Sequence, residues 1–576
     1  MSCFFSITGD LITEEVLCRL SLVDLISCLS ACKRLNELIT SSTNLVYLME
    51  LEMAGMVDNP HCSYEKYPRN RRLDMLKEHN RRWETFDCQW REDVQLPVRV
   101  KGAYRVTTAE GHLLLLPLDE QHIDQIGGDI YSAPLPDYPK AKLQWNKIRL
   151  GKHLRPAKAA LLEHDLLVCF TITPAVPSDG GRMQIHLIQH SSGGPHPDAS
   201  CPTLDLCADY NAENIKLSCI SIAGAHLVFL LDFMDGPHIE KTFLNLWNWK
   251  SGRCVKSEMV GHSQELYKGD LLLLREDLLM IVNVEALSLD IYLISDYTES
   301  GAINDAGDIQ LIKSLLLPKL ASQASLKWMT FSGSRRSINS NPSSFAKHGL
   351  KERPFINDPL NSLVCTSLCI KSSRLGGTYT MMCDFVAPLR AFLAHAVEAL
   401  ATYRKRKVEY PERLPHITVT PIAWNLWGPK STRWFPFKVN PSDSESSMQI
   451  VRSIHGARFF LVHITSEGRP ARMGSVSHIT LIDFDRWRVR RPPSHRPVRR
   501  ETSCIPSGAF FSEPITSCLP YLYEDVPPSF ASDREQVNRD GGSALKNLWA
   551  RMQIHEQEII RFPVSRPRSF MVSTRF

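Results

Sequence analysis

The chain has 576 residues, of which 43% are hydrophobic and 22% charged, and this composition excludes an intrinsically disordered or collagen-like protein. The 67 basic and 62 acidic residues leave a formal net charge of +5, which is too small for so long a chain to indicate nucleic-acid binding. No apolar run reaches the roughly 18 residues of a membrane-spanning helix, and no secretory signal is recognisable. We therefore expect an intracellular protein, in the cytoplasm or the nucleus, that contacts neither membrane nor nucleic acid.

Short amphipathic helices are predicted for the first part of the chain, within residues 1–58. The first helix follows Thr13, whose side chain can accept from free amides, with Glu14 placed where the helix dipole favours an anion. The second begins after the capping-box pair Ser21 and Asp24, and its apolar residues recur at i, i+3, i+4 and i+7. A third and a fourth helix follow from leucines at helical spacing. Because so small a unit buries its apolar faces only in part, we expect it to dock onto a partner.

The string LITEEVLCRLSLVDLISCLSACKRLNELI at residues 11–39 resembles the F-box, a three-helix motif that docks on the adaptor of a cullin-based ubiquitin ligase. Leu11-Ile12 stands where the motif usually has Leu-Pro. The latter half of the motif is represented by Asp24-Leu25, Leu29, Cys32, Lys33, Arg34-Leu35 and Leu38-Ile39. An ordinary helical hairpin packed on the rest of the chain is the alternative interpretation.

The resemblance implies an SCF-type substrate receptor whose partners are the adaptor protein and, through it, a cullin. It also implies a set of apolar residues that lie either at the adaptor or inside the helical unit. These adaptor-binding candidates are Leu11, Ile12, Val16, Leu17, Leu20, Leu25, Leu29, Leu35 and Leu38.

Residues 59–93 are predicted to connect the helical unit to the rest of the chain through a strongly charged helix. Leu73, Leu76 and Trp83 recur at helical spacing on one side of this helix, opposite several arginines. We interpret the apolar side as the face that packs on a neighbouring domain, with a partner groove as the alternative. Acidic residues interleave with the arginines, which argues against RNA binding.

From Val94 onward the periodicity changes to that of antiparallel strands. Six pairs of apolar or alternating runs follow, and their spacing suits four-stranded blades of about 40 to 50 residues with insertions. The pairs are 112–118 with 128–135, 164–172 with 183–188, 226–233 with 242–249, 270–282 with 289–295, 362–370 with 378–385, and 458–465 with 477–484. We expect one large all-β domain over residues 94–530 and a C-terminal tail with a short helix over residues 531–576.

The expected fold class is α+β multidomain, with a short all-α N-terminal unit and a large all-β domain that forms a divergent β-propeller. Ring closure supports this prediction because it removes the long exposed edges of an open sheet. Trp247-Asn248-Trp249-Lys250-Ser251-Gly252 resembles the end of a WD-type repeat strand. Two or three separate β-sandwiches are the alternative. The whole arrangement resembles large F-box families of mushroom-forming fungi.

The sequence carries none of the common catalytic motifs for serine hydrolases, zinc proteases or nucleotide-binding enzymes. We therefore expect no enzyme activity, no cofactor and no metal site. Cys365, Cys369 and Cys383 alternate with apolar residues and are assigned to the core. His186, His190 and His196 are interpreted as solvated turn residues without a role.

Two basic stretches remain, at residues 404–407 and at residues 486–500. The second has seven arginines, and we expect Arg488, Arg490 and Arg491 to contact the target protein. The target is unknown, and such a site favours an acidic or phosphorylated one. Solvated loops and a nuclear-import signal are the alternative interpretations of both stretches.

The sequence thus predicts a substrate-recognition subunit of an SCF-type ubiquitin ligase that performs no bond chemistry itself. A β-propeller scaffold outside any ligase is the main alternative, with the helices acting only as a cap. A propeller-type hydrolase or lyase is a more remote alternative.

Overall fold

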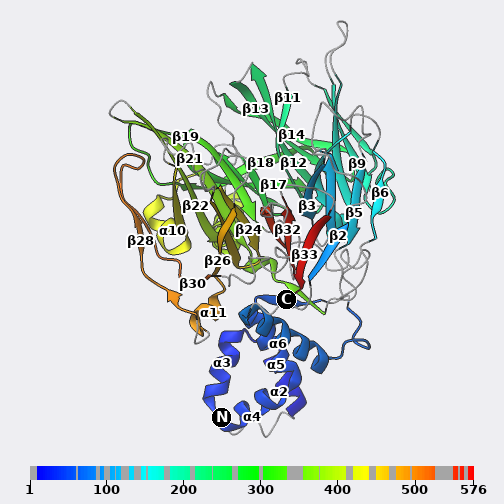
Figure 1. The fold of residues 1–576 in the computed structure, drawn as a ribbon, viewed down its shortest axis with the longest axis vertical. Helices are drawn as coiled ribbons and strands as arrows, with labels where there is room; N and C mark the ends of the chain where they lie inside the picture. Colours follow the sequence, from blue (N-terminus) through cyan, green and yellow to red (C-terminus); the bar gives the residue numbers. More distant parts are fainter. Residues whose placement is uncertain are drawn as a thin grey trace, which may run out of the picture.

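The computed structural model consists of an N-terminal helical lobe at one end of the molecule and a much larger set of β-sheets at the other (Figure 1). The structure describes residues 10–59, 62–85, 91–95, 104–109, 112–117, 129–134, 144–150, 154–173, 182–207, 215–235, 238–262, 270–297, 303–333, 354–374, 377–409, 419–439, 449–465, 475–492, 496–525, 549–555, 558–563 and 569–575. We refer to the helices of residues 10–53 as the helical lobe and to the sheets as the β-region.

The helical lobe contains four short helices, as the sequence predicts. They are α2 (Asp10–Leu17), α3 (Leu22–Ala31), α4 (Lys33–Ser41) and α5 (Thr43–Met53). Ser21 caps α3 by accepting a hydrogen bond from the Asp24 amide at 3.3 Å, and Ser42 caps α5 in the same way. One buried side chain from each helix meets in a common core, which consists of Leu17, Leu25, Ile39 and Leu45.

A short strand and a long helix follow the lobe and connect it to the β-region. Strand β1 (Met56–Asp58) pairs with β20 (Phe355–Asn357), and helix α6 spans Arg69–Thr85. Of the predicted connector of residues 59–93, residues 69–85 are helical, whereas residues 91–93 belong to a strand, Arg91–Gln95, instead of the helix. Residues 86–90 lie outside the described residues. The pairing of β1 was not predicted, because a three-residue strand carries too little alternation to be recognised.

The β-region contains seven antiparallel sheets of four or five strands in the described part of the chain. The first three sheets, each in order along the chain, are β3 (Tyr104–Ala109), β4 (His112–Pro117), β5 (Ile130–Pro134), β6 (Asn146–Ile148); β7 (Arg155–Ala160), β8 (Leu166–Thr173), β9 (Arg182–Gln189), β10 (Thr203–Cys207); and β11 (Ile215–Ala223), β12 (His226–Asp235), β13 (His238–Asn248), β14 (Arg253–His262). The next two are β15 (Leu271–Arg275), β16 (Leu278–Asn283), β17 (Ser288–Tyr297), β18 (Ile303–Leu316); and β19 (Ala324–Gly333), β21 (Leu363–Arg374), β22 (Gly377–Pro388), β23 (Arg433–Val439).

The last two large sheets use strands from the C-terminal part of the chain. They are β24 (Gln449–His455), β25 (Arg458–Thr465), β26 (Ser475–Asp483), β30 (Tyr521–Asp525), β27 (Val498–Arg499); and β31 (Trp549–His555), β32 (Glu558–Pro563), β33 (Ser569–Arg575), β2 (Arg91–Gln95). A small hairpin of β28 (Ser503–Ile505) and β29 (Ile515–Ser517) contacts β23 of the fifth sheet. All six predicted strand pairs are antiparallel neighbours in these sheets.

The C-terminal segment differs from the prediction of a tail with a short helix. Residues 549–575 instead contribute three strands, and β33 pairs with β2, so that Phe570 lies opposite Val94. The sheets therefore extend past the predicted limit of residue 530, while residues 526–548 lie outside the described residues. The prediction failed because arginine interrupts the apolar alternation of these strands, and because the partner β2 lies at the opposite end of the chain.

Successive sheets contact each other through their first strands. Strand β11 contacts β7 and β15, and contacts continue from β15 to β19, from β19 to β24, from β24 to β31 and from β31 to β3. Between the first and second sheets, a buried cluster joins Ile130 and Ile148 to Leu167 and Cys169. Each sheet thus packs on its neighbour along the chain, and the last packs on the first.

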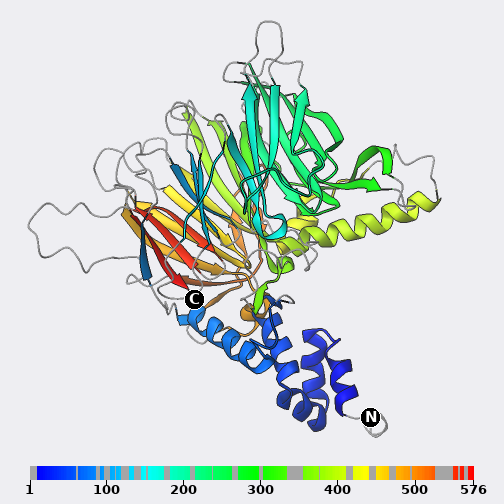
Figure 2. The ribbon, with the colours of Figure 1, turned by 90° about the vertical axis from the view of Figure 1, so that its right-hand side faces the viewer.

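Several helices interrupt the β-region. They are α8 (Leu161–His164), the 3₁₀ helix η4 (Pro359–Asn361), α9 (Leu389–Glu409), α10 (Trp424–Ser431) and α11 (Arg486–Arg490). The long helix α9 buries Phe392 and Ala396 against the fourth and fifth sheets and extends along them (Figure 2). Among the described residues, no helix combines the length and the apolar character that a membrane crossing requires.

Candidate functional site

The helical lobe exposes three large aliphatic side chains on its first two helices. Ile12 and Val16 lie one turn apart on α2 and are 58% and 47% exposed, and Val23 on α3 is 49% exposed. Exposed aliphatic groups on so small a unit are candidates for contact with another protein, because water contact disfavours them. We call Ile12, Val16 and Val23 the apolar surface of the lobe.

The nine predicted adaptor-binding residues divide into two groups in the structure. Leu17 and Leu25 are 4% and 3% exposed and belong to the core of the lobe, so they support its shape rather than face a partner. Ile12 and Val16 face the solvent. The half-buried residues that pack against the core are Leu20, Leu29, Leu35 and Leu38. Leu11 belongs to α2, and its side chain lies outside the described residues.

Val23 was missed by the sequence analysis although it is among the most exposed aliphatic residues of the lobe. It directly follows Leu22, which is 1% exposed, and precedes Asp24, whose carboxylate accepts a hydrogen bond from the capping residue Ser21. Val23 therefore lies off the apolar stripe of α3. A β-branched apolar residue on the polar side of a short helix is the signal that could have found it. On α4, a shallow hollow adjoins Leu38 and is lined by Arg34, Glu37, Thr40 and Ser41.

A buried arginine fixes the start of the connector to the β-region. The Arg72 guanidinium is 0% exposed and donates to Asp58 Oδ1 at 2.6 Å, to the Cys62 carbonyl at 2.7 Å and to the Pro354 carbonyl at 3.2 Å. Burial lowers the pKa of Arg72, but the hydrogen bond to Asp58, together with the negative charge of Asp58 and smaller contributions from Cys62 and Tyr64, raises it by more, so the net pKa is raised. Since Pro354 directly precedes β20, this one side chain ties α6, β1 and the β-region together.

The far end of α6 is held by a second group of buried side chains. The Trp83 indole is fully buried against Phe460, and the Arg458 guanidinium lies 4.3 Å from its ring centroid. Arg496 donates to the carbonyls of Trp83 and Glu84, which are helix-end acceptors. Burial lowers the pKa of Arg458 to about 10. The charged connector therefore packs its aromatic face on the β-region, as predicted.

The arginine stretch at residues 486–500 is partly buried in this joint, which corrects the expectation of an exposed basic segment. Arg488 is 8% exposed, donates to Asn80 of α6 at 3.1 Å and lies 3.8 Å from Asp483 Oδ2. Arg490 and Arg491 are exposed. The prediction failed for Arg488 because Asp485 caps a short helix here, and that helix turns Arg488 toward α6. A second contact, between Arg486 and Glu52 at 2.9 Å, reaches the lobe itself.

One buried constellation has the residue types of a hydrolase triad. His190 Nε2 lies 2.7 Å from Ser132 Oγ, and His190 Nδ1 lies 3.5 Å from Asp165 Oδ1. Ser132, His190 and Asp165 are 1%, 7% and 3% exposed. Through these contacts the group links the first sheet to the second. His190 and His196 are therefore buried and bonded residues, not the solvated turn residues that were predicted.

The described part of the chain contains no cluster of His, Cys, Asp and Glu suited to a metal ion. Cys365, Cys369 and Cys383 are buried, as predicted for core residues.

Residues 10–47, which include the whole apolar surface of the lobe, match the family model of the F-box domain. The chain is an F-box domain-containing protein. F-box domains bind the adaptor of SCF-type ubiquitin ligases, and F-box proteins are generally substrate receptors rather than enzymes. No curated protein matches the chain.

Solved structures give only distant likenesses. Hsv2 of Kluyveromyces lactis is 10% identical over 49% of this chain and 72% of its own, with a TM-score of 0.23. A puromycin-hydrolyzing peptidase of Mycobacterium tuberculosis is 12% identical over 70% of this chain and 48% of its own, with a TM-score of 0.27. A chain of the Polycomb Repressive Complex 2 of Chaetomium thermophilum is 9% identical over 64% of this chain and 92% of its own, with a TM-score of 0.21. Scores this low support no argument about function.

Proposed function

We propose that this chain is the substrate-recognition subunit of an SCF-type ubiquitin ligase. The adaptor, and through it a cullin, binds the helical lobe, and a target protein binds the β-region. The observation that carries the proposal is the apolar surface of Ile12, Val16 and Val23 within an F-box domain. The chain acts by raising the effective concentration of the target near the ligase rather than by bond chemistry.

The connection between lobe and β-region supports this role. A receptor that positions a target needs a stiff link, since a flexible link would dilute the effective concentration over a larger volume. Arg72 and Trp83, at the two ends of α6, are both 0% exposed and contact the β-region. The ion pair of Glu52 with Arg486 adds a direct contact between α5 and α11.

We further infer that the seven sheets are the blades of one β-propeller. Support comes from their four-stranded antiparallel form, their order along the chain and the contacts between successive first strands. The pairing of β2 with β33 joins the two ends of the β-region in one sheet, as a closed ring requires. The exposed Arg490 and Arg491 remain candidates for target contact, while Arg488 has a structural role.

The adaptor contact is tested by co-purification of the full chain with an SCF adaptor. The double variant Ile12→Asp/Val16→Asp should lower the affinity at least about tenfold, because an unpaired carboxylate in an apolar interface is costly. Val397→Asp is the matched control, since Val397 is an exposed valine, 54% accessible, on α9 of the β-region. Circular dichroism confirms that the variants fold.

A wild-type chain that fails to bind the adaptor would contradict the proposal and favour a scaffold outside any ligase. Equal losses for the double variant and for Val397→Asp would contradict the assignment of the contact to the apolar surface.

A further inference from the structure

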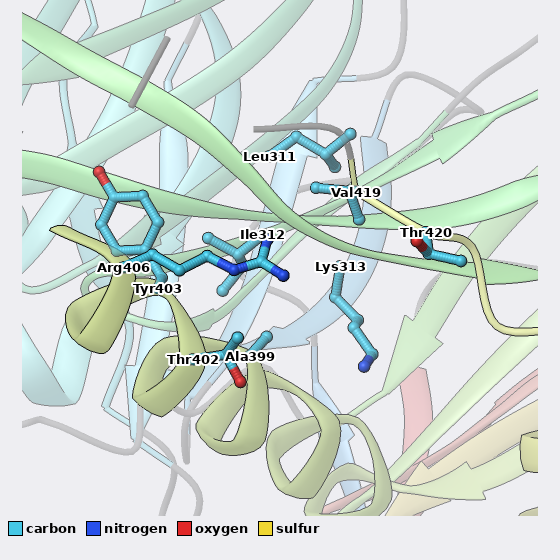
Figure 3. Close-up of a pocket in the computed structure, with 9 residues that line it drawn as sticks. All are labelled: Leu311, Ile312, Lys313, Ala399, Thr402, Tyr403, Arg406, Val419 and Thr420. Atoms are coloured by element: carbon cyan, nitrogen blue, oxygen red, sulfur yellow. The ribbon is translucent and has the colours of Figure 1, made fainter. Parts of the chain in front are cut away.

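A pocket lies between helix α9 and strand β18 (Figure 3). None of its described lining residues belongs to the helical lobe or to the joint at α6. Its volume is about 170 Å³. Leu311 and Ile312 of β18 and Ala399 of α9 provide an apolar floor, and Thr402 and Thr420 place hydroxyl groups at its edge. This combination resembles ligand sites in general, in which an apolar lining carries a few polar groups that fix orientation.

The charged groups that line the pocket are both cationic. They are Lys313 of β18 and Arg406 of α9, and among the described residues that line the pocket there is no carboxylate. Within the described residues, Arg406 forms no ion pair. Lys313 Nζ lies 3.8 Å from Glu398 Oε2, but Glu398 is 69% exposed, so water screens this pair. The pocket therefore keeps a positive potential.

Two further observations agree with this potential. Arg404, Lys405 and Arg406 follow one another in the last turns of α9, where the basic side chains lie near the helix C-terminus. His395, about three turns before Arg406 on α9, has a pKa that is lowered by burial and then by Lys313. Cations at an open pocket attract anionic ligands and raise their association rate.

We propose that this pocket binds a phosphate group. Phosphate monoesters carry between about one and a half and two negative charges at neutral pH, which two cations can balance, and the planar guanidinium of Arg406 suits two phosphate oxygens at once. The threonine hydroxyls of Thr402 and Thr420 supply further donors. The phosphate belongs either to a small phosphate ester or to a phosphorylated side chain of a protein. In the second case the pocket is part of the target-binding surface and rests on the proposed function.

The test is isothermal titration calorimetry of the purified full chain, without adaptor, against inorganic phosphate, acetate and phosphothreonine-containing peptides. Binding of phosphate and phosphopeptides, weakened about tenfold or more in Arg406→Gln and in Lys313→Gln, is the expected result. Arg404→Gln is the matched control, because Arg404 is an exposed arginine on the same helix that does not line the pocket. This variant should bind as wild type within about twofold.

The absence of phosphate binding, equal weakening by Arg404→Gln, or acetate binding as tight as phosphate binding would each overturn the proposal. Tighter binding of phosphopeptides than of inorganic phosphate supports the pocket and assigns it to protein targets, while equal binding supports it as a site for small phosphate esters. Because the titration needs no adaptor, its failure leaves the adaptor contact standing. Loss of the adaptor contact likewise leaves the pocket standing.

Discussion

Replacement of Arg72 by methionine should loosen the link between the helical lobe and the β-region. Methionine keeps much of the aliphatic volume but removes the donors to Asp58, to the Cys62 carbonyl and to the Pro354 carbonyl. Breaking a buried ion pair by removal of one partner costs about 3–5 kcal/mol. Arg69, whose Nη1 lies 3.5 Å from Asp58 Oδ2, offsets part of that cost, so we expect a value near the lower limit.

The assay is alkylation of Cys62 in the native state, since this thiol is 1% exposed and its own carbonyl accepts from Arg72. If local opening controls the reaction, about 3 kcal/mol corresponds to roughly a hundredfold faster labelling, at about tenfold per 1.4 kcal/mol. Arg71→Met is the control, because Arg71 is exposed on the same helix. If Cys62 is labelled in Arg72→Met no faster than in wild type and in Arg71→Met, the contacts of Arg72 do not stabilise the link between the lobe and the β-region.

Three further predictions concern stability and reactivity. Leu25→Ala should lower the free energy of unfolding of the helical lobe by about 2–5 kcal/mol, because Leu25 is buried in the core. Ile12→Ala should lower it by less than about 0.5 kcal/mol, because Ile12 is exposed. Similar losses in thermal or urea unfolding would mean that the core and the apolar surface are wrongly assigned. Burial lowers the pKa of His395, so the unfolded chain binds this proton more readily. The free energy of unfolding should therefore fall as the pH drops below about 6.5, and it should fall less steeply in His395→Gln. Urea unfolding measures this dependence, and the same pH dependence in wild type and His395→Gln would contradict the prediction. Burial raises the pKa of the Cys169 thiol, so iodoacetamide should label the exposed Cys201 before Cys169. Peptide mass spectrometry measures the order of labelling, and earlier labelling of Cys169 would contradict the prediction.

The helical lobe was largely predictable from sequence because its signals are local. The cap at Ser21 and the apolar spacing that includes Leu25 and Leu29 lie within a few residues of one another, and helix formation depends on such near neighbours. Periodicity identified the apolar residues but did not separate Leu17, which is buried, from Val16, which is exposed. That distinction depends on how α2, α3, α4 and α5 pack against one another, and the spacing of residues along one helix gives no information about this packing.

The β-region was predictable only where both partners of a strand pair are apolar and close in sequence. The hairpin of β12 and β13 meets both conditions, since paired residues such as Leu230 and Leu244 are apolar and the two strands follow each other closely in the sequence. The pairing of β2 with β33 meets neither condition. Arg488 and Arg496 illustrate the same limit for charged residues, since their burial is decided by α6, which lies far away in the sequence.

The central claim is that the helical lobe binds an SCF adaptor while the β-region binds a target. Its most direct test is quantitative mass spectrometry of proteins that co-purify with the tagged full chain and with Ile12→Asp/Val16→Asp. For the wild-type chain we predict adaptor and cullin in near-equal amounts together with further proteins, and for the variant we predict loss of adaptor and cullin but retention of the further proteins. A wild-type chain that recovers no adaptor, or a variant that recovers as much adaptor as wild type, would contradict the claim.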